Sequence, residues 1–115
     1  PAGTPNGQRP MPTPSSLVTV DGFNTNPMGT FDSWLANNAN RTDGNNVIAY
    51  ADWAGSNSPN GTNFYGTTTM PNIFDWTYDL AQAPDVSQNQ AKAAVVQLFF
   101  LNNWMHDYFY DSGFT

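Results

Sequence analysis

The sequence predicts an α+β fold in which short β-strands and long loops precede one long C-terminal α-helix. Two observations carry this prediction. All nine prolines and eight of the nine glycines come before residue 87, whereas residues 87–110 contain neither. Within that uninterrupted segment apolar residues recur every three or four positions, which is the period of an α-helix. With 115 residues the chain has room for one small domain.

The segment before the helix divides into two parts. Residues 1–16 are predicted to form an extended Pro-rich arm, because five prolines occur in the first 14 residues and there is little to bury. Residues 17–86 are predicted to form a loop-rich β region. Its three weak strands are β-prone runs bounded by Gly, Asn and other turn residues, at 17–20, 47–53 and 73–78.

The remaining parts of this β region have a turn-forming composition. Residues 31–36 favour a helical turn about as much as a strand or loop, whereas residues 24–30 and 55–69 are predicted loops. We expect Phe64 and Tyr65 to attach the second loop to a neighbouring segment. Residues 43–46, Asp-Gly-Asn-Asn, indicate a turn, since the later carboxylate of a calcium loop is missing.

Residues 87–112 are predicted to form the helix. Ser87 and Gln90 have the spacing of a capping box, in which the Ser hydroxyl accepts from the Gln amide and the Gln side chain reaches back. Gly113 suits the end of the helix, which would be roughly 36 Å long. The stripe expected to face the core comprises Ala91, Ala94, Leu98, Leu101, Met105 and Tyr108.

Apolar residues extend beyond that stripe and cover most of the helix circumference. Such a helix needs cover on more than one side, and the Gly- and Pro-rich residues before it are a thin supply. The sequence therefore predicts an interaction face that packs against further chain or a partner, formed by Val95, Phe99, Phe100, Trp104, His106 and Phe109.

Composition narrows the classes of partner and the compartment. The net charge is −6, and the basic residues are Arg9, Arg41 and Lys92, which excludes the basic stripe that nucleic-acid binding requires. No run of about 20 apolar residues occurs, so no membrane span is expected. Polarity from uncharged Asn, Gln, Ser and Thr is typical of proteins outside the cell. We also expect any secretion signal or propeptide to have been removed or omitted.

The residue types available exclude several kinds of chemistry. The absence of Cys excludes disulfides, thiolate metal sites and a Cys nucleophile. His106 is the one His, and no Glu is present, so neither catalytic nor metal-binding residues are predicted. Because adjacent helix residues point about 100° apart, Asp107 is not expected to orient His106. Asn40 and Asn60 begin Asn-x-Thr sequences and are possible glycosylation sites.

Three segments resemble the fungalysin family of secreted zinc metallopeptidases: residues 44–50, residues 74–78 and, most specifically, residues 94–115. The family pattern QLFY-x-x-N-x-x-HD-x-x-Y-x-x-GF is matched here by Gln97, Leu98, Phe99, Phe100, Asn103, His106, Asp107, Tyr110, Gly113 and Phe114. The resemblance implies an incomplete upper lobe of a thermolysin-like fold, with residues 87–110 as its first long helix. The zinc of the complete enzyme would be held by an HExxH helix and a downstream Glu, none of which is in this sequence.

Two functions follow as expectations. The favoured one is the N-terminal, non-catalytic portion of a secreted fungalysin-like zinc metalloendopeptidase, inactive alone and packing against the missing catalytic part. The alternative is an extracellular structural fragment that associates with copies of itself, as in a filament. A carbohydrate- or surface-binding module using the seventeen aromatic residues is a weaker third interpretation, since those residues are more simply core.

Overall fold

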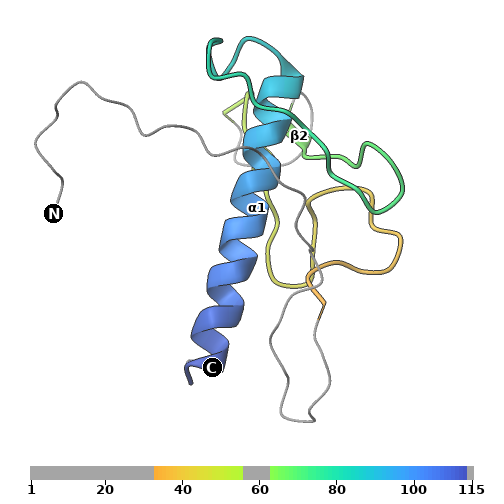
Figure 1. The fold of residues 1–115 in the computed structure, drawn as a ribbon, viewed down its shortest axis with the longest axis vertical. Helices are drawn as coiled ribbons and strands as arrows, with labels where there is room; N and C mark the ends of the chain where they lie inside the picture. The colour runs from red at the N-terminus through yellow and green to blue at the C-terminus, as the bar shows by residue number, and fades with distance from the viewer. Residues whose placement is uncertain (1–32, 56–62, 114–115) are drawn as a thin grey trace, which may run out of the picture.

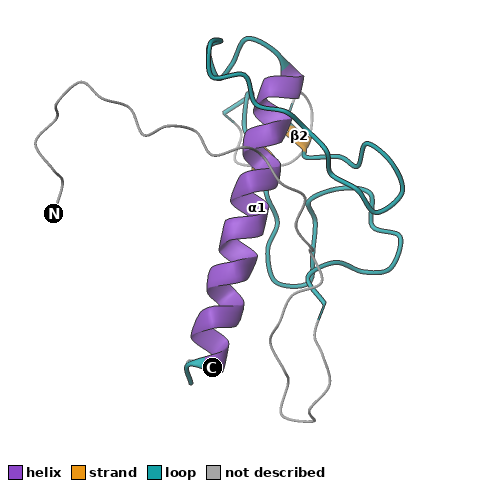
Figure 2. Cartoon of the chain, in the orientation of Figure 1, coloured by secondary structure: helices purple, strands orange, loops and turns teal. Residues whose placement is uncertain are grey.

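The computed structural model describes residues 33–55 and 63–113, and within them two short strands and one helix. The strands β1 (Tyr50–Ala51) and β2 (Phe64–Tyr65) pair antiparallel, and the helix α1 spans Gln88–Asp111 (Figure 1). Loops make up the rest and gather mainly on one side of α1 (Figure 2). The predicted α+β class, with one long C-terminal helix, is confirmed.

The ends of α1 follow from its capping residues. Ser87 has an extended backbone, and its hydroxyl accepts a hydrogen bond from the Gln90 amide at 3.2 Å. At the other end Gly113 takes a φ of +97°, which favours glycine and stops the helix. The predicted reach of Gln90 back to Ser87 is wrong. The Gln90 side chain instead accepts from the backbone amide of Asp79 at 3.0 Å and donates to its carbonyl at 2.6 Å.

The face of α1 that is buried differs from the predicted stripe. The buried row repeats every four residues and comprises Ala91, Val95, Phe99, Asn103 and Asp107. Five of the six members of the predicted stripe are instead exposed: Ala94, Leu98 (52%), Leu101 (46%), Met105 (43%) and Tyr108 (51%). Two polar residues in the buried row explain the error, because hydrophobic periodicity counts Asn and Asp against a core.

The core lies between this buried row and the loops that precede it. Ala49, Val95 and Phe99 form its centre, with Leu35, Val47 and Ala51 packed around them. Gly44 crosses close over Phe99, since a Cβ at Gly44 would lie 2.3 Å from the Trp34 carbonyl oxygen and 3.0 Å from the Phe99 ring. The loop backbone at Gly44 therefore packs directly on the Phe99 ring of the helix.

A buried threonine joins the loops to the small sheet. The Thr42 hydroxyl donates to the Ala49 carbonyl at 2.6 Å and accepts from the Gly66 amide at 2.9 Å. These bonds satisfy backbone groups that the two-residue strands leave unpaired. The residues before β1 and those after β2 are thus connected without a longer sheet.

The strand predictions have mixed outcomes. The run at 47–53 contains β1, and the predicted turn at 43–46 is present, closed by the Gly44 amide on the Val47 carbonyl at 2.9 Å. The run at 73–78 forms no strand, and only Ile73 makes an isolated bridge, to Met70. Phe64 and Tyr65 do attach their loop to a neighbour, but as strand β2 rather than as loop residues.

Other predictions fall partly or wholly outside the described residues. The described part of the 31–36 segment, residues 33–36, has no helical turn. The arm at 1–16, the strand at 17–20 and the loop at 24–30 lie outside the described residues.

Candidate functional site

A buried carboxylate near the end of α1 joins the helix to the loop at residue 34. Asp107 is fully buried, and its Oδ2 accepts a hydrogen bond from the Trp34 indole Nε1 at 2.6 Å. Its Oδ1 lies 3.1 Å from His106 Nδ1. A charged or polar group this deep requires such partners. The cluster therefore ties the described N-terminal loop to the last turns of α1.

The His106–Asp107 contact corrects an expectation from helix geometry. Adjacent residues leave the helix about 100° apart, but the side-chain torsions of His106 and Asp107 bring the imidazole and the carboxylate together. His106 also stacks on Tyr110, with ring centroids 6.3 Å apart and planes at 16°. Asp107 thus does orient His106, whose side chain is 38% exposed.

This cluster does not fit a zinc site. Zinc hydrolases supply about three N or O ligands and a general base, which is usually Glu. The sequence offers one His and no Glu, and no group of three or more His, Cys, Asp or Glu side chains lies together among residues 33–55 and 63–113. What the cluster does in this chain is to link the loop at Trp34 to α1.

Asn103 is the other polar member of the buried row. It is fully buried, and its side-chain amide donates to the Phe99 carbonyl one turn earlier at 2.9 Å. Its Oδ1 is buried and has no hydrogen-bond partner among the residues that the structure describes. The buried interface between α1 and the loops is thus partly polar along the C-terminal half of the helix.

The opposite side of α1 carries an exposed apolar surface. We call it the outer face and define it by Ala94, Leu98, Leu101, Met105 and Tyr108, all of which are exposed. Trp104 borders this face and stacks on Tyr108, with ring centroids 5.5 Å apart and planes at 9°. The stacked pair widens the C-terminal half of the face.

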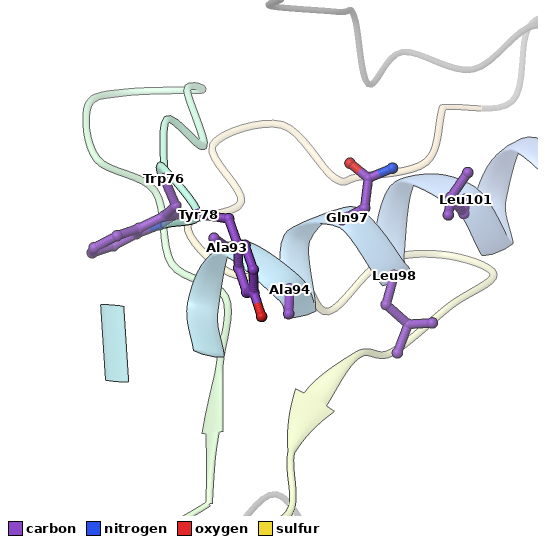
Figure 3. A pocket seen from close by; sticks show the side chains of 7 residues that line it. All are labelled: Trp76, Tyr78, Ala93, Ala94, Gln97, Leu98 and Leu101. Carbon is purple, nitrogen blue, oxygen red and sulfur yellow. The ribbon is translucent and has the colours of Figure 1, made fainter. Parts of the chain in front are cut away.

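A groove extends the outer face toward the N-terminal half of the helix. It has a volume of about 470 Å³ and is lined by Trp76, Tyr78, Ala93, Ala94, Gln97, Leu98 and Leu101 (Figure 3). The Trp76 indole donates to the Thr67 carbonyl at 2.6 Å, and Lys92 lies 5.0 Å from its ring centroid. These contacts hold one wall of the groove in place.

The residues of the predicted interaction face separate into two groups. Val95 and Phe99 are 6% and 2% exposed against the loops of this chain, so these two do not present a surface to another chain, which corrects the prediction. Phe100 is half-buried and packs edge-on against Trp34. Trp104 and Phe109 are exposed, and His106 is partly exposed.

The periodicity of the outer-face residues predicted that they pack in the core, whereas in the structure they are exposed. Their regular spacing was visible, but nothing in it says on which side the loops pack. Of the two possible glycosylation sites, Asn40 is exposed, and Asn60 lies outside the described residues.

Comparison with known proteins connects this arrangement to a peptidase family. A family model described as fungalysin metallopeptidase (M36) matches residues 8–115. The extracellular metalloproteinase 5 of Arthroderma otae is 33% identical over 88 residues, which cover 72% of this chain and 13% of that protein. The extracellular metalloproteinase 1 of Arthroderma gypseum gives the same identity and coverage.

A longer match comes from the extracellular metalloproteinase 5 of Trichophyton tonsurans, at 30% identity over 113 residues, which cover 92% of this chain and 17% of that protein. No solved structure gives a significant match. No helix within the described residues is long and apolar enough to cross a membrane.

This chain spans less than a fifth of the length of these relatives. The match over nearly all of its residues shows that it belongs to the fungalysin metallopeptidase family.

Proposed function

We propose that this chain is the N-terminal, non-catalytic portion of a secreted fungalysin-like zinc metalloendopeptidase, and that it acts by packing against the catalytic part. The observation that carries the proposal is the family match over residues 8–115 of a chain that has a single His and no Glu. Such a chain cannot supply both the ligands and the base of a zinc-activated water. Its contribution to the enzyme is then structural.

Secretion and lobe architecture belong to the same proposal. The matched relatives are named extracellular metalloproteinases, which supports export of this protein. The long helix with loops and a small sheet on one side is consistent with part of an upper lobe of a thermolysin-like fold. In that arrangement α1 is a structural helix of the lobe, and the zinc lies in the part of the enzyme outside this chain.

The test is a chimera in which residues 8–115 replace the matching region of the Trichophyton tonsurans enzyme, whose match extends over 113 residues. We expect the chimera to be secreted, to hold about one zinc per molecule by metal analysis and to cleave casein. The 115-residue chain alone should do neither of the last two. The control is the same enzyme with the matching region deleted, which should not accumulate as active peptidase. Zinc and casein cleavage in the pure 115-residue chain would contradict the proposal.

A further inference from the structure

We propose that Asn40 is a site of N-linked glycosylation, and that the glycan is attached before the loop around Asn40 folds. The inference rests on the secretion part of the proposed function, because Asn-x-Thr sequences are glycosylated in secreted proteins. It goes beyond that function by assigning a modification to a named side chain and an order to modification and folding.

Asn40 combines the acceptor sequence with an accessible position. Asn40, Arg41 and Thr42 form an Asn-x-Thr sequence whose middle residue is not proline. Asn40 is exposed, and its backbone carbonyl accepts a hydrogen bond from the Thr68 amide at 3.0 Å. The fold thus holds this residue through its backbone, and a sugar can project from it into solvent.

The surface next to Asn40 suits a polar group and lies outside the core. A hollow of about 450 Å³ is lined in part by Ala39, the residue before Asn40. Its polar lining residues are Ser33, Asn37, Asn38 and Asn72. The core cluster around Phe99 does not include Asn40. A glycan at Asn40 thus has amide and hydroxyl groups beside it for hydrogen bonding, and it displaces none of the core packing.

Thr42 determines the order of glycosylation and folding. The acceptor sequence requires a hydroxyl two residues after the Asn, so the transferase must reach the Thr42 hydroxyl. In the folded chain Thr42 is 0% exposed. Its hydroxyl donates to the Ala49 carbonyl at 2.6 Å and accepts from the Gly66 amide at 2.9 Å. The hydroxyl that the transferase needs is therefore accessible only before Ala49 and Gly66 close on it.

The reaction joins the Asn40 amide to the sugar of a lipid-linked oligosaccharide. The amide nitrogen forms a bond to C1 of the first sugar, and the bond from that carbon to the lipid pyrophosphate breaks. The amide loses one proton, and the lipid pyrophosphate leaves with the electron pair of the broken bond. The Thr42 hydroxyl is not consumed, so it can form its bonds to Ala49 and Gly66 afterwards.

Site mapping in the chimera tests the modification. The chimera is secreted from yeast, and its peptides are treated with peptide-N-glycosidase in ¹⁸O-water, which labels each residue that carried a glycan. We expect the label at Asn40 in most molecules of the fraction that cleaves casein. Asn40→Gln should abolish the label at this position. Asn37→Gln is the control, because Asn37 is exposed but begins no acceptor sequence, and it should leave the label at Asn40 unchanged.

A transfer assay tests the order of the two events. Active chimera from a bacterial host without the transferase is offered purified oligosaccharyltransferase and a lipid-linked oligosaccharide. A peptide of residues 36–46 is the unfolded acceptor. We expect transfer to the peptide to be at least about tenfold faster than transfer to Asn40 of the native chimera, because Thr42 is buried there. Equal rates would contradict the proposed order.

The two proposals fail separately. An active chimera without a glycan at Asn40 would overturn this inference and leave the proposed function standing. An inactive chimera is mapped in the chain retained by the cell. A glycan at Asn40 there would overturn only the proposed function, and its absence would overturn both.

Discussion

Asp107 is the residue on which the described contacts between the helix end and the loops converge. Its carboxylate is fully buried and accepts from Trp34, which lies 73 positions earlier in the chain. A hydrogen bond to a charged group is worth more than a neutral one. The Trp34–Asp107 bond is therefore a strong single test of the fold.

Trp34→Phe keeps an aromatic ring at this buried position but removes the indole donor together with the volume of its five-membered ring. We expect the free energy of unfolding of the chain to fall by about 1–3 kcal/mol, because Asp107 Oδ2 loses the bond from Trp34. Urea unfolding followed by circular dichroism measures the change. Trp53→Phe is the control, since Trp53 is exposed and should shift the same quantity by less than about 0.5 kcal/mol. A Trp34→Phe chain as stable as the parent would contradict the role of the bond.

Gly44→Ala tests the close approach of the loop to the core. The added methyl would meet the Trp34 carbonyl, a backbone atom that cannot turn aside, and the Phe99 ring. Overpacking of this kind costs about 1–3 kcal/mol of unfolding free energy. Gly66→Ala is the comparison, because its nearest neighbour is the Val96 side chain at 2.7 Å, which can move more readily. Thermal unfolding should rank Gly44→Ala as the more destabilising substitution, and the reverse order would be inconsistent with the described packing.

At the scale of elements, α1 begins where a side chain caps it. Ser87→Ala removes the hydroxyl that accepts from the Gln90 amide, and should lower the unfolding free energy by about 1 kcal/mol. Ser87→Asp supplies another cap acceptor and favours the positive end of the helix dipole, so it should retain the parent's stability. Denaturant midpoints of the three chains check this. A Ser87→Ala chain as stable as the parent would show that the cap does not matter.

The two faces of α1 respond differently to truncation. Phe99→Ala empties the core between helix and loops and should cost about 3–5 kcal/mol of unfolding free energy in the 115-residue chain. Leu98→Ala, one residue away but on the outer face, should cost less than about 0.5 kcal/mol there. In the chimera the Leu98→Ala cost should rise to about 2 kcal/mol or more if the rest of the enzyme covers the face. Calorimetry of both proteins measures the difference.

The sequence predicted the extent of α1 better than it predicted which side of α1 packs against the loops. Ser87, the absence of Gly and Pro, and Gly113 are local signals, and they gave both ends of α1. Which side the loops cover is a tertiary property, and here it is decided by Gly44 passing over Phe99 and by Trp34 reaching Asp107. The two-residue strands were hard to predict for the same reason, since their pairing depends on Thr42 and not on a long β-prone run.

At the scale of the whole molecule, family membership was accessible from the sequence because the residues that carry it are close together. Gln97, Asn103, His106 and Asp107 lie within eleven positions of one helix. The role of each was not accessible, because only the folded chain brings Trp34 to Asp107 and Asp107 to His106. The family match over residues 8–115 shows that these contacts occur in a member of the fungalysin metallopeptidase family.

The link between Trp34 and Asp107 has a consequence for synthesis on the ribosome. The loop residues around Trp34 are made first, yet the helix they rest on is made more than fifty residues later. Contacts so distant along the chain form slowly, because a long segment must close before they contribute. Through that interval Trp34 and Leu35 lack the helix side chains against which they pack in the folded chain.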